Sequence, residues 1–266
     1  MDIQKYYRAP SLQAAYEELG AHPQNAIIGG GLWLKKVGAP IHTLVDLIDL
    51  DLHRIEETPE LVKIGALVSL RELETHPSIA KLGGGCFKEA LGSIMGVALR
   101  RMATIGGSLA GKYPFSDIIT PLLVLEATVS LYPNRQVSLR DFLSEKGKRQ
   151  DILTHLTINK NPGIGFFKKV SNTQLDFAIL NVAILKERSI KIAVGSRPGS
   201  GQLAVKASEF ISSIDKPTLK DIEQTAELAV AELGFASTTA ASGEYRQTLA
   251  RAYIKRGLKE VCRHEG

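Results

Sequence analysis

The chain has 266 residues, of which 44% are hydrophobic and 23% charged, with a formal net charge of +5 and a pI of about 9.1. This composition is ordinary for a globular protein, and the length allows two or three compact units. The basic residues form no stripe interleaved with aromatic residues, so we expect no binding to nucleic acid. No apolar run nears the roughly 20 residues that span a membrane, and residues 1–10 lack the apolar core of a signal peptide. We therefore expect a cytoplasmic protein that does not bind a membrane.

The first part of the chain predicts a small α/β unit. Apolar residues at helical spacing predict a helix over residues 12–19. An apolar strand over residues 25–28 then runs into the glycines at 29–31, and a second strand is predicted over residues 43–47. The glycine run therefore lies in the connection between two strands.

The pattern changes near residue 58. Residues 61–65 alternate as a half-buried strand. Ser69 and Glu72 have the spacing of a capping box, which predicts that a helix begins there. The glycines at 83–85 interrupt this helix, and a second helix is predicted over residues 87–98.

The densest set of signals lies between residues 104 and 132. Residues 104–107 are predicted to form a strand end or a tight turn. Either Ser116 or Asp117 is predicted to cap a short helix whose first turn tolerates Pro121. A strand that ends at Pro133 follows.

The last hundred residues predict an antiparallel sheet with helices. Strands are expected over residues 165–170 and 190–194, and amphipathic helices over residues 222–233 and 249–261. We divide the chain into three predicted domains, at residues 1–57, 58–160 and 161–266.

Two glycine runs are candidates for binding an anion. Glycines permit positive φ and have no Cβ, so the run at Gly29–Gly31 suits either a structural turn or a loop around a pyrophosphate. A Rossmann fingerprint is excluded, because the third glycine position is Leu34 and the following crossover is too short. Gly106-Gly107-Ser108, followed by Asp117, is either a second part of one dinucleotide site or an unrelated turn.

The residues that commonly bind metals do not have the required spacing. Cys86 and Cys262 stand alone, and a [2Fe–2S] or [4Fe–4S] cluster usually takes about four thiolates. We therefore expect no metal site. Trp33 is predicted to be a core residue rather than a residue that stacks on a flavin.

Several segments together resemble the FAD-binding subunits of molybdenum hydroxylases, the family of the xanthine dehydrogenase and carbon monoxide dehydrogenase flavoproteins. The most specific segment is Arg100-Arg-Met-Ala-Thr-Ile-Gly-Gly-Ser-Leu-Ala110, followed by Ser116-Asp117 and Pro121-Leu-Leu-Val-Leu125. It is similar to the family's R-N-x-A-T-I-G-G-N-x-A, S/A-D and P-x-L-L-A-L. Ile28–Leu32 resembles the family's A-G-G-T-D loop, and Lys169-Val-Ser171 with Asp176-Phe-Ala178 resembles K-x-S-R-R-x-x-D-F-A.

The resemblance implies an α+β fold. A two-subdomain FAD-binding domain of the p-cresol methylhydroxylase-like type would precede a C-terminal domain of antiparallel sheet and helices. It also implies the residues that contact FAD: Ile27, Ile28, Gly29, Gly30, Gly31, Leu32, Trp33 and Leu34 in a first pyrophosphate loop; Thr104, Gly107 and Ser108 in a second; and Asp117, Ile94, Leu153 and one of Lys168 or Lys169 around the rest of the cofactor.

The resemblance implies an oxidoreductase subunit in a larger complex. Electrons would pass from a molybdopterin-binding large subunit through a [2Fe–2S] small subunit to FAD on this chain, and then to NAD or another acceptor. No residue is assigned as a general acid or base. Gly31, Leu32, Ser108, Asn172 and Thr173 replace polar or charged residues of the family pattern. The alternatives are therefore a non-catalytic assembly subunit with weak or lost FAD binding, and an independent flavin oxidase.

Overall fold

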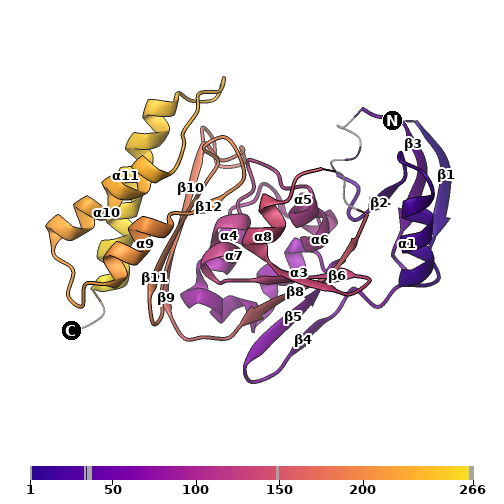
Figure 1. The fold of residues 1–266 in the computed structure, drawn as a ribbon, viewed down its shortest axis with the longest axis horizontal. Helices are drawn as coiled ribbons and strands as arrows, with labels where there is room; N and C mark the ends of the chain where they lie inside the picture. Colours follow the sequence, from indigo (N-terminus) through magenta and orange to yellow (C-terminus); the bar gives the residue numbers. More distant parts are fainter. Residues whose placement is uncertain (1, 33, 35–37, 148–149, 264–266) are drawn as a thin grey trace. The chain divides into compact units, whose positions relative to one another are not determined.

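The computed structural model describes residues 2–32, 34, 38–147 and 150–263 (Figure 1). Their contacts form two compact units, and the chain passes repeatedly from one to the other. The first unit comprises residues 1–73, 96–111 and 127–159, and the second comprises residues 74–95, 112–126 and 160–266. The predicted division into three domains, with boundaries after residues 57 and 160, stays a prediction, because the two units are groups of contacting residues and do not test these boundaries.

The first unit begins with a small parallel sheet. Its strands are β1 (Ile3–Arg8), β2 (Ala26–Ile28) and β3 (Ile41–Asp46), and β3 is central. Helix α1 (Leu12–Ala21) begins after Ser11, whose hydroxyl accepts the N–H of Ala14. Its buried residues join a core that contains the central strand. The predicted helix and both predicted strands are confirmed.

A five-stranded antiparallel sheet forms the rest of the first unit's framework. The strands lie in the order β4 (Ile55–Glu57), β5 (Leu61–Gly65), β8 (Ile152–Asn159), β6 (Thr128–Tyr132) and β7 (Arg135–Ser138). Burial alternates along β6, as expected when one face covers a core. Helix α8 (Leu139–Ser144) packs beside the β6–β7 hairpin. The strands predicted over residues 61–65 and up to Pro133 are confirmed.

Capping explains one of the short helices. Helix α3 (Leu70–Thr75) begins with the predicted capping box. The N–H of Ser69 donates to Glu72 Oε2 at 2.8 Å, and the N–H of Glu72 donates to Ser69 Oγ at 3.1 Å. After it, the 3₁₀ helix η1 (Ile79–Gly85) ends in three glycines with positive φ.

Three sequence predictions in the middle of the chain are wrong. The helix predicted over residues 87–98 is two helices, α4 (Cys86–Gly92) and α5 (Val97–Met102), because Met95 has a φ of +33° and Gly96 is extended. Residues 104–107 are not a strand end or turn but the start of helix α6 (Ile105–Ala110). Helix α7 (Ile119–Val124) contains Pro121 in its first turn, as predicted, but among the described residues no side chain caps it.

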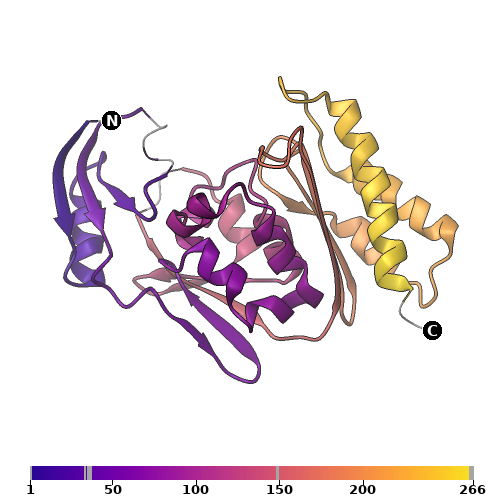
Figure 2. The same cartoon turned by 180° about the vertical axis from the view of Figure 1, so that it is seen from behind.

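The second unit is a helix–sheet–helix arrangement (Figures 1 and 2). Its antiparallel sheet has the order β12 (Gln202–Leu203), β11 (Ile190–Gly195), β10 (Leu180–Lys186) and β9 (Ile164–Val170). Helices α9 (Val205–Ser212), α10 (Leu219–Glu232) and α11 (Gly243–Cys262) cover one face, and α4 and α7 cover the other. Consequently β10 is buried on both faces over all but its last residue.

The strands and helices predicted for this region are confirmed. On α11 the buried side includes Ala250, Ile254 and Leu258, whereas Ala252 is exposed. In the described part of the chain, no helix is both long and apolar enough to cross a membrane.

Candidate functional site

The two glycine runs, about seventy-five residues apart in the sequence, lie against each other in the first unit. A Cβ on Gly29 would lie 2.7 Å from Thr104 Oγ1, and a Cβ on Gly30 would lie 1.6 Å from the carbonyl oxygen of Met102. Gly31 has a φ of +70°, which favours glycine. Glycine is therefore required at this crossing both for space and for backbone conformation.

The second run is organised by Thr104. Its hydroxyl accepts the N–H of Gly107 at 3.2 Å and caps α6, while Ser108 Oγ donates to the Thr104 carbonyl oxygen at 2.8 Å. A Cβ on Gly106 would lie 2.7 Å from the Cβ of Ala66, so protein packing requires this glycine. A Cβ on Gly107 would meet, among the described residues, the Thr104 hydroxyl at 3.0 Å and nothing else within 4 Å. Packing therefore restricts Gly107 much less than Gly30 or Gly106.

The other predicted contact residues divide between the two units. Ile27, Ile28, Leu32 and Leu34 are half-buried in the first unit, and Leu153 is 9% exposed in β8. Trp33 lies outside the described residues. The remaining predicted residues, Ile94, Asp117, Lys168 and Lys169, belong to the second unit.

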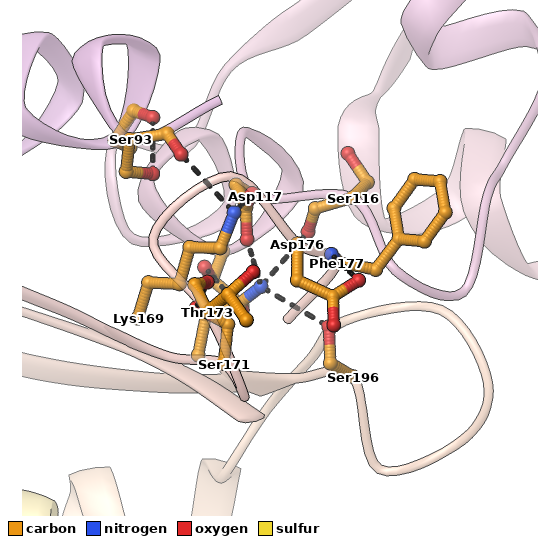
Figure 3. A network of polar contacts seen from close by, with 12 residues as sticks. Ser93, Ser116, Asp117, Lys169, Ser171, Thr173, Asp176, Phe177 and Ser196 are labelled. Atoms are coloured by element: carbon orange, nitrogen blue, oxygen red, sulfur yellow. Dashed lines mark hydrogen bonds and ion pairs between the residues drawn. The ribbon is translucent and has the colours of Figure 1, made fainter. Parts of the chain in front are cut away.

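In the second unit, Asp117 and Lys169 form a buried ion pair (Figure 3). Lys169 Nζ donates to Asp117 Oδ2 at 2.9 Å and to the carbonyl oxygen of Ser93, the residue before Ile94, at 3.1 Å. The two charged side chains are 7% and 6% exposed. Lys168 points to the opposite face of β9, since neighbouring residues of a strand alternate. Lys169 is therefore the lysine of this polar cluster.

Burial dominates the electrostatics of Asp117. Loss of solvent raises the pKa of its carboxyl group, and the charge of Lys169, its hydrogen bond and the amide of Asn181 act in the opposite direction. A buried carboxylate is tolerated when it is paired and hydrogen-bonded. The cluster thus offers a negatively charged acceptor for hydroxyl groups and a nearby cation.

Asn181 is a member of this cluster that the sequence analysis missed. Its side chain is fully buried on β10, and its Nδ2 donates to Asp117 Oδ1 at 3.1 Å. A signal was present in the sequence, because a single amide interrupts the apolar run Leu180–Leu185. A polar group in a strand buried on both faces needs partners, and here they belong to the candidate site.

Among the described residues, no group of three or more His, Cys, Asp or Glu side chains is placed to hold a metal ion. Both cysteines are free thiols, and burial raises the pKa of Cys86 to about 12. Cys86 therefore stays protonated near neutral pH.

Two glycine loops in contact on a mixed α/β framework are a feature of proteins that bind a nucleotide cofactor. Comparison with known families specifies the class. Residues 1–159 match the family described as the FAD binding domain in molybdopterin dehydrogenase, and residues 165–261 match the CO dehydrogenase flavoprotein C-terminal domain. The chain belongs to this family of FAD-binding oxidoreductase flavoproteins, which confirms the resemblance and the fold class expected from the sequence.

Individual relatives match over nearly their whole length. The glyceraldehyde dehydrogenase medium chain of Sulfolobus acidocaldarius is 25% identical, with 97% of this chain and 98% of the relative covered. The nicotine 6-hydroxylase medium subunit of Paenarthrobacter nicotinovorans is also 25% identical, with 97% and 96% covered. Among solved structures, quinoline 2-oxidoreductase from Pseudomonas putida 86 has a TM-score of 0.85 and 25% identity, with 97% and 96% covered.

Proposed function

We propose that this chain is the FAD-binding electron-transfer subunit of a molybdenum hydroxylase complex. Its partners would be a molybdopterin-binding large subunit and a [2Fe–2S] small subunit, and its electron acceptor NAD or another oxidant. The observation that supports this most is the contact between the two glycine runs, which brings both predicted pyrophosphate loops together. The relatives named as medium chains or subunits support an assembly of this kind, and a cytoplasmic location stays a prediction.

The residues at the two glycine runs are compatible with FAD, and most hydrogen bonds to its pyrophosphate would come from the backbone. Residues Ile27–Leu32 and Leu34 would contact the pyrophosphate, as would Thr104, Gly107 and Ser108. Gly31 and Leu32 offer no polar side chain, so backbone N–H groups would bind this part of the cofactor. Ile94, Asp117, Leu153 and Lys169 would contact its remaining parts.

FAD supplies the ability to accept single electrons and release pairs. The residues of this chain bind and orient the cofactor and limit its access to water. Asp117 accepts hydrogen bonds, and the charge of Lys169 opposes the rise that burial causes in the pKa of that carboxyl group. No proton transfer is assigned to any side chain, because electron transfer through a bound flavin requires no general acid or base from this subunit.

Gly107→Ala tests FAD binding directly. The added methyl group would lie 3.0 Å from the hydroxyl of Thr104, which must shift slightly, whereas alanine favours a helix over glycine by about 1 kcal/mol, so we expect the two effects nearly to cancel in stability. If the pyrophosphate approaches Gly107, the Kd for FAD should rise at least about tenfold, which corresponds to about 1.4 kcal/mol. Fluorescence titration of FAD and thermal unfolding measure the two effects.

The matched control is Gly20→Ala, a helical glycine with open space around its Cβ position. It should leave the Kd for FAD unchanged. A folded Gly107→Ala variant that binds FAD like the wild type would remove Gly107 from the site. Wild-type protein that retains no FAD at micromolar concentration would favour the assembly-subunit alternative.

The isolated chain should not oxidise a hydroxylase substrate. Such a reaction requires a centre that generates the oxygen nucleophile, and the proposal assigns that centre to the large subunit. We expect the purified chain to exchange electrons with NADH or an artificial acceptor only, and substrate oxidation to appear when the partner subunits are added. Assays with purines, aldehydes and N-heterocycles, with and without partners, measure this. Turnover by the chain alone would support an independent oxidase.

A further inference from the structure

Asn181 is unusual for its position. It is fully buried in β10, where its neighbours from Leu180 to Leu185 are otherwise apolar. The strand residue opposite it is Gly195, and a Cβ there would lie 2.4 Å from Asn181 Oδ1. The glycine thus leaves the space that the amide occupies. Burying an amide is costly unless its polar atoms are hydrogen-bonded, so this side chain needs partners.

Both polar atoms of the Asn181 amide form hydrogen bonds. Its Oδ1 accepts from Thr120 Oγ1 at 3.0 Å, which determines the orientation of the amide. Its Nδ2 then faces Asp117 Oδ1 at 3.1 Å, the carbonyl oxygen of Ser116 at 3.1 Å and Ser196 Oγ at 3.3 Å. The amide therefore holds both the side chain of Asp117 and the backbone beside it.

The carboxylate of Asp117 has a different partner on each oxygen. Oδ2 accepts from Lys169 (Figure 3), and Oδ1 accepts from Asn181. Partners on both oxygens prevent rotation of the carboxylate plane. Because a carboxylate has about four lone-pair sites, each oxygen can still accept a hydrogen bond from a ligand hydroxyl.

Arg246 on α11 binds two backbone carbonyl groups near Asn181, one just before β10 and one just after β11. Its Nη1 donates to the carbonyl oxygens of Ile179 and Ser196, and it is 3% exposed. Ile179 lies two residues before Asn181, and Ser196 follows Gly195 with a φ of +56°. The guanidinium group therefore stabilises the local backbone on which the amide depends.

We propose that Asn181 is a positioning residue for FAD: it orients the Asp117 carboxylate toward the hydroxyl groups of the cofactor and does not contact the cofactor itself. The inference rests on the proposed function, because Asp117 is taken to bind FAD. It adds that the geometry of this contact is set from β10.

Asn181→Leu keeps the branched shape of the side chain and removes its hydrogen-bonding groups. We expect the Kd for FAD to rise about tenfold, since Asp117 Oδ1 loses its donor and the carboxylate can rotate, and we expect the melting temperature to fall. If this variant does not fold, Asn181→Ala leaves room for water and serves instead. The control is Val182→Ala on the same strand, whose side chain belongs to the core under α9–α11. It should lower the melting temperature and leave the Kd within twofold.

A double-mutant cycle separates positioning from general damage. In an Asp117→Asn background, Asn181→Leu should change the Kd by less than twofold, while its effect on melting temperature persists. Independent, multiplicative effects on the Kd would overturn the inference, as would wild-type affinity in the Asn181 variants. A wild-type protein without FAD affinity would instead refute the proposed function and the inference with it.

Discussion

Arg246→Met is expected to lower the free energy of unfolding by about 3 kcal/mol, because unpaired buried hydrogen-bonding groups cost about 1–3 kcal/mol each. Methionine occupies similar space but donates no hydrogen bond. The buried carbonyl oxygens of Ile179 and Ser196 would lose their donor, whereas the hydroxyl of Thr238, which accepts from Nη2 at 2.7 Å, is on an exposed residue and can bind water instead. Removing a poorly solvated cation offsets part of this loss, since burial also lowers the pKa of Arg246.

The control for this prediction lies one and a half turns further along α11. Arg251 pairs with Glu227 on the surface, where the two side chains are 34% and 62% exposed. Arg251→Met should therefore change the free energy of unfolding by about 0–1 kcal/mol. Urea unfolding of the two variants compares them directly. Equal losses would show that the buried contacts of Arg246 contribute nothing beyond those of a surface ion pair.

Gly30→Ala is expected to separate the two glycine loops. The new Cβ would lie 1.6 Å from the Met102 carbonyl oxygen and 2.6 Å from its carbonyl carbon. Both are backbone atoms, so no side chain can rotate to relieve the overlap. We expect stability to fall by about 3 kcal/mol, the upper part of the range for overpacking. The Kd for FAD should rise by roughly 100-fold or more, which corresponds to about 2.7 kcal/mol.

Gly96→Ala provides the comparison for Gly30→Ala. Gly96 is in the same unit and has open space at its Cβ position, and its φ of −89° suits any residue. As an N-cap substitution it should cost less than about 1 kcal/mol and leave FAD affinity nearly unchanged. Titration calorimetry and thermal unfolding report both quantities. A Gly30→Ala variant with wild-type stability would mean that the loops do not touch in solution.

The elements that sequence patterns predicted well depend on short-range signals. The strand Leu61–Gly65 and the capping box at Ser69 involve residues within a few positions of one another. The break at Met95 does not, because a methionine with positive φ has no signature in the local sequence. Helix α6 was missed since six residues with two glycines show too little periodicity.

The candidate site was predictable in its parts but not in its arrangement. The glycine runs were visible in the sequence, yet their contact is a tertiary one, made where Gly29 and Gly30 meet Thr104 and Met102. Lys169 was distinguished from Lys168 only by the orientation of β9. The family resemblance supplied the candidate residues, whereas Asn181 required the positions of β10 and α7.

The placement of residues 112–126 in the second unit has a consequence for synthesis. Asp117 and α7 fall within the first family match, but the partners Lys169 and Asn181 and the strands that cover α7 fall within the second. While the ribosome is still translating the C-terminal part, the buried face of α7, with Ile119 and Leu122, has no sheet to pack against. During translation this apolar segment therefore cannot reach its final packing until β10 and β11 have emerged. A fragment that ends at residue 159 would lack these strands, so the buried face of α7 would stay without the sheet that covers it.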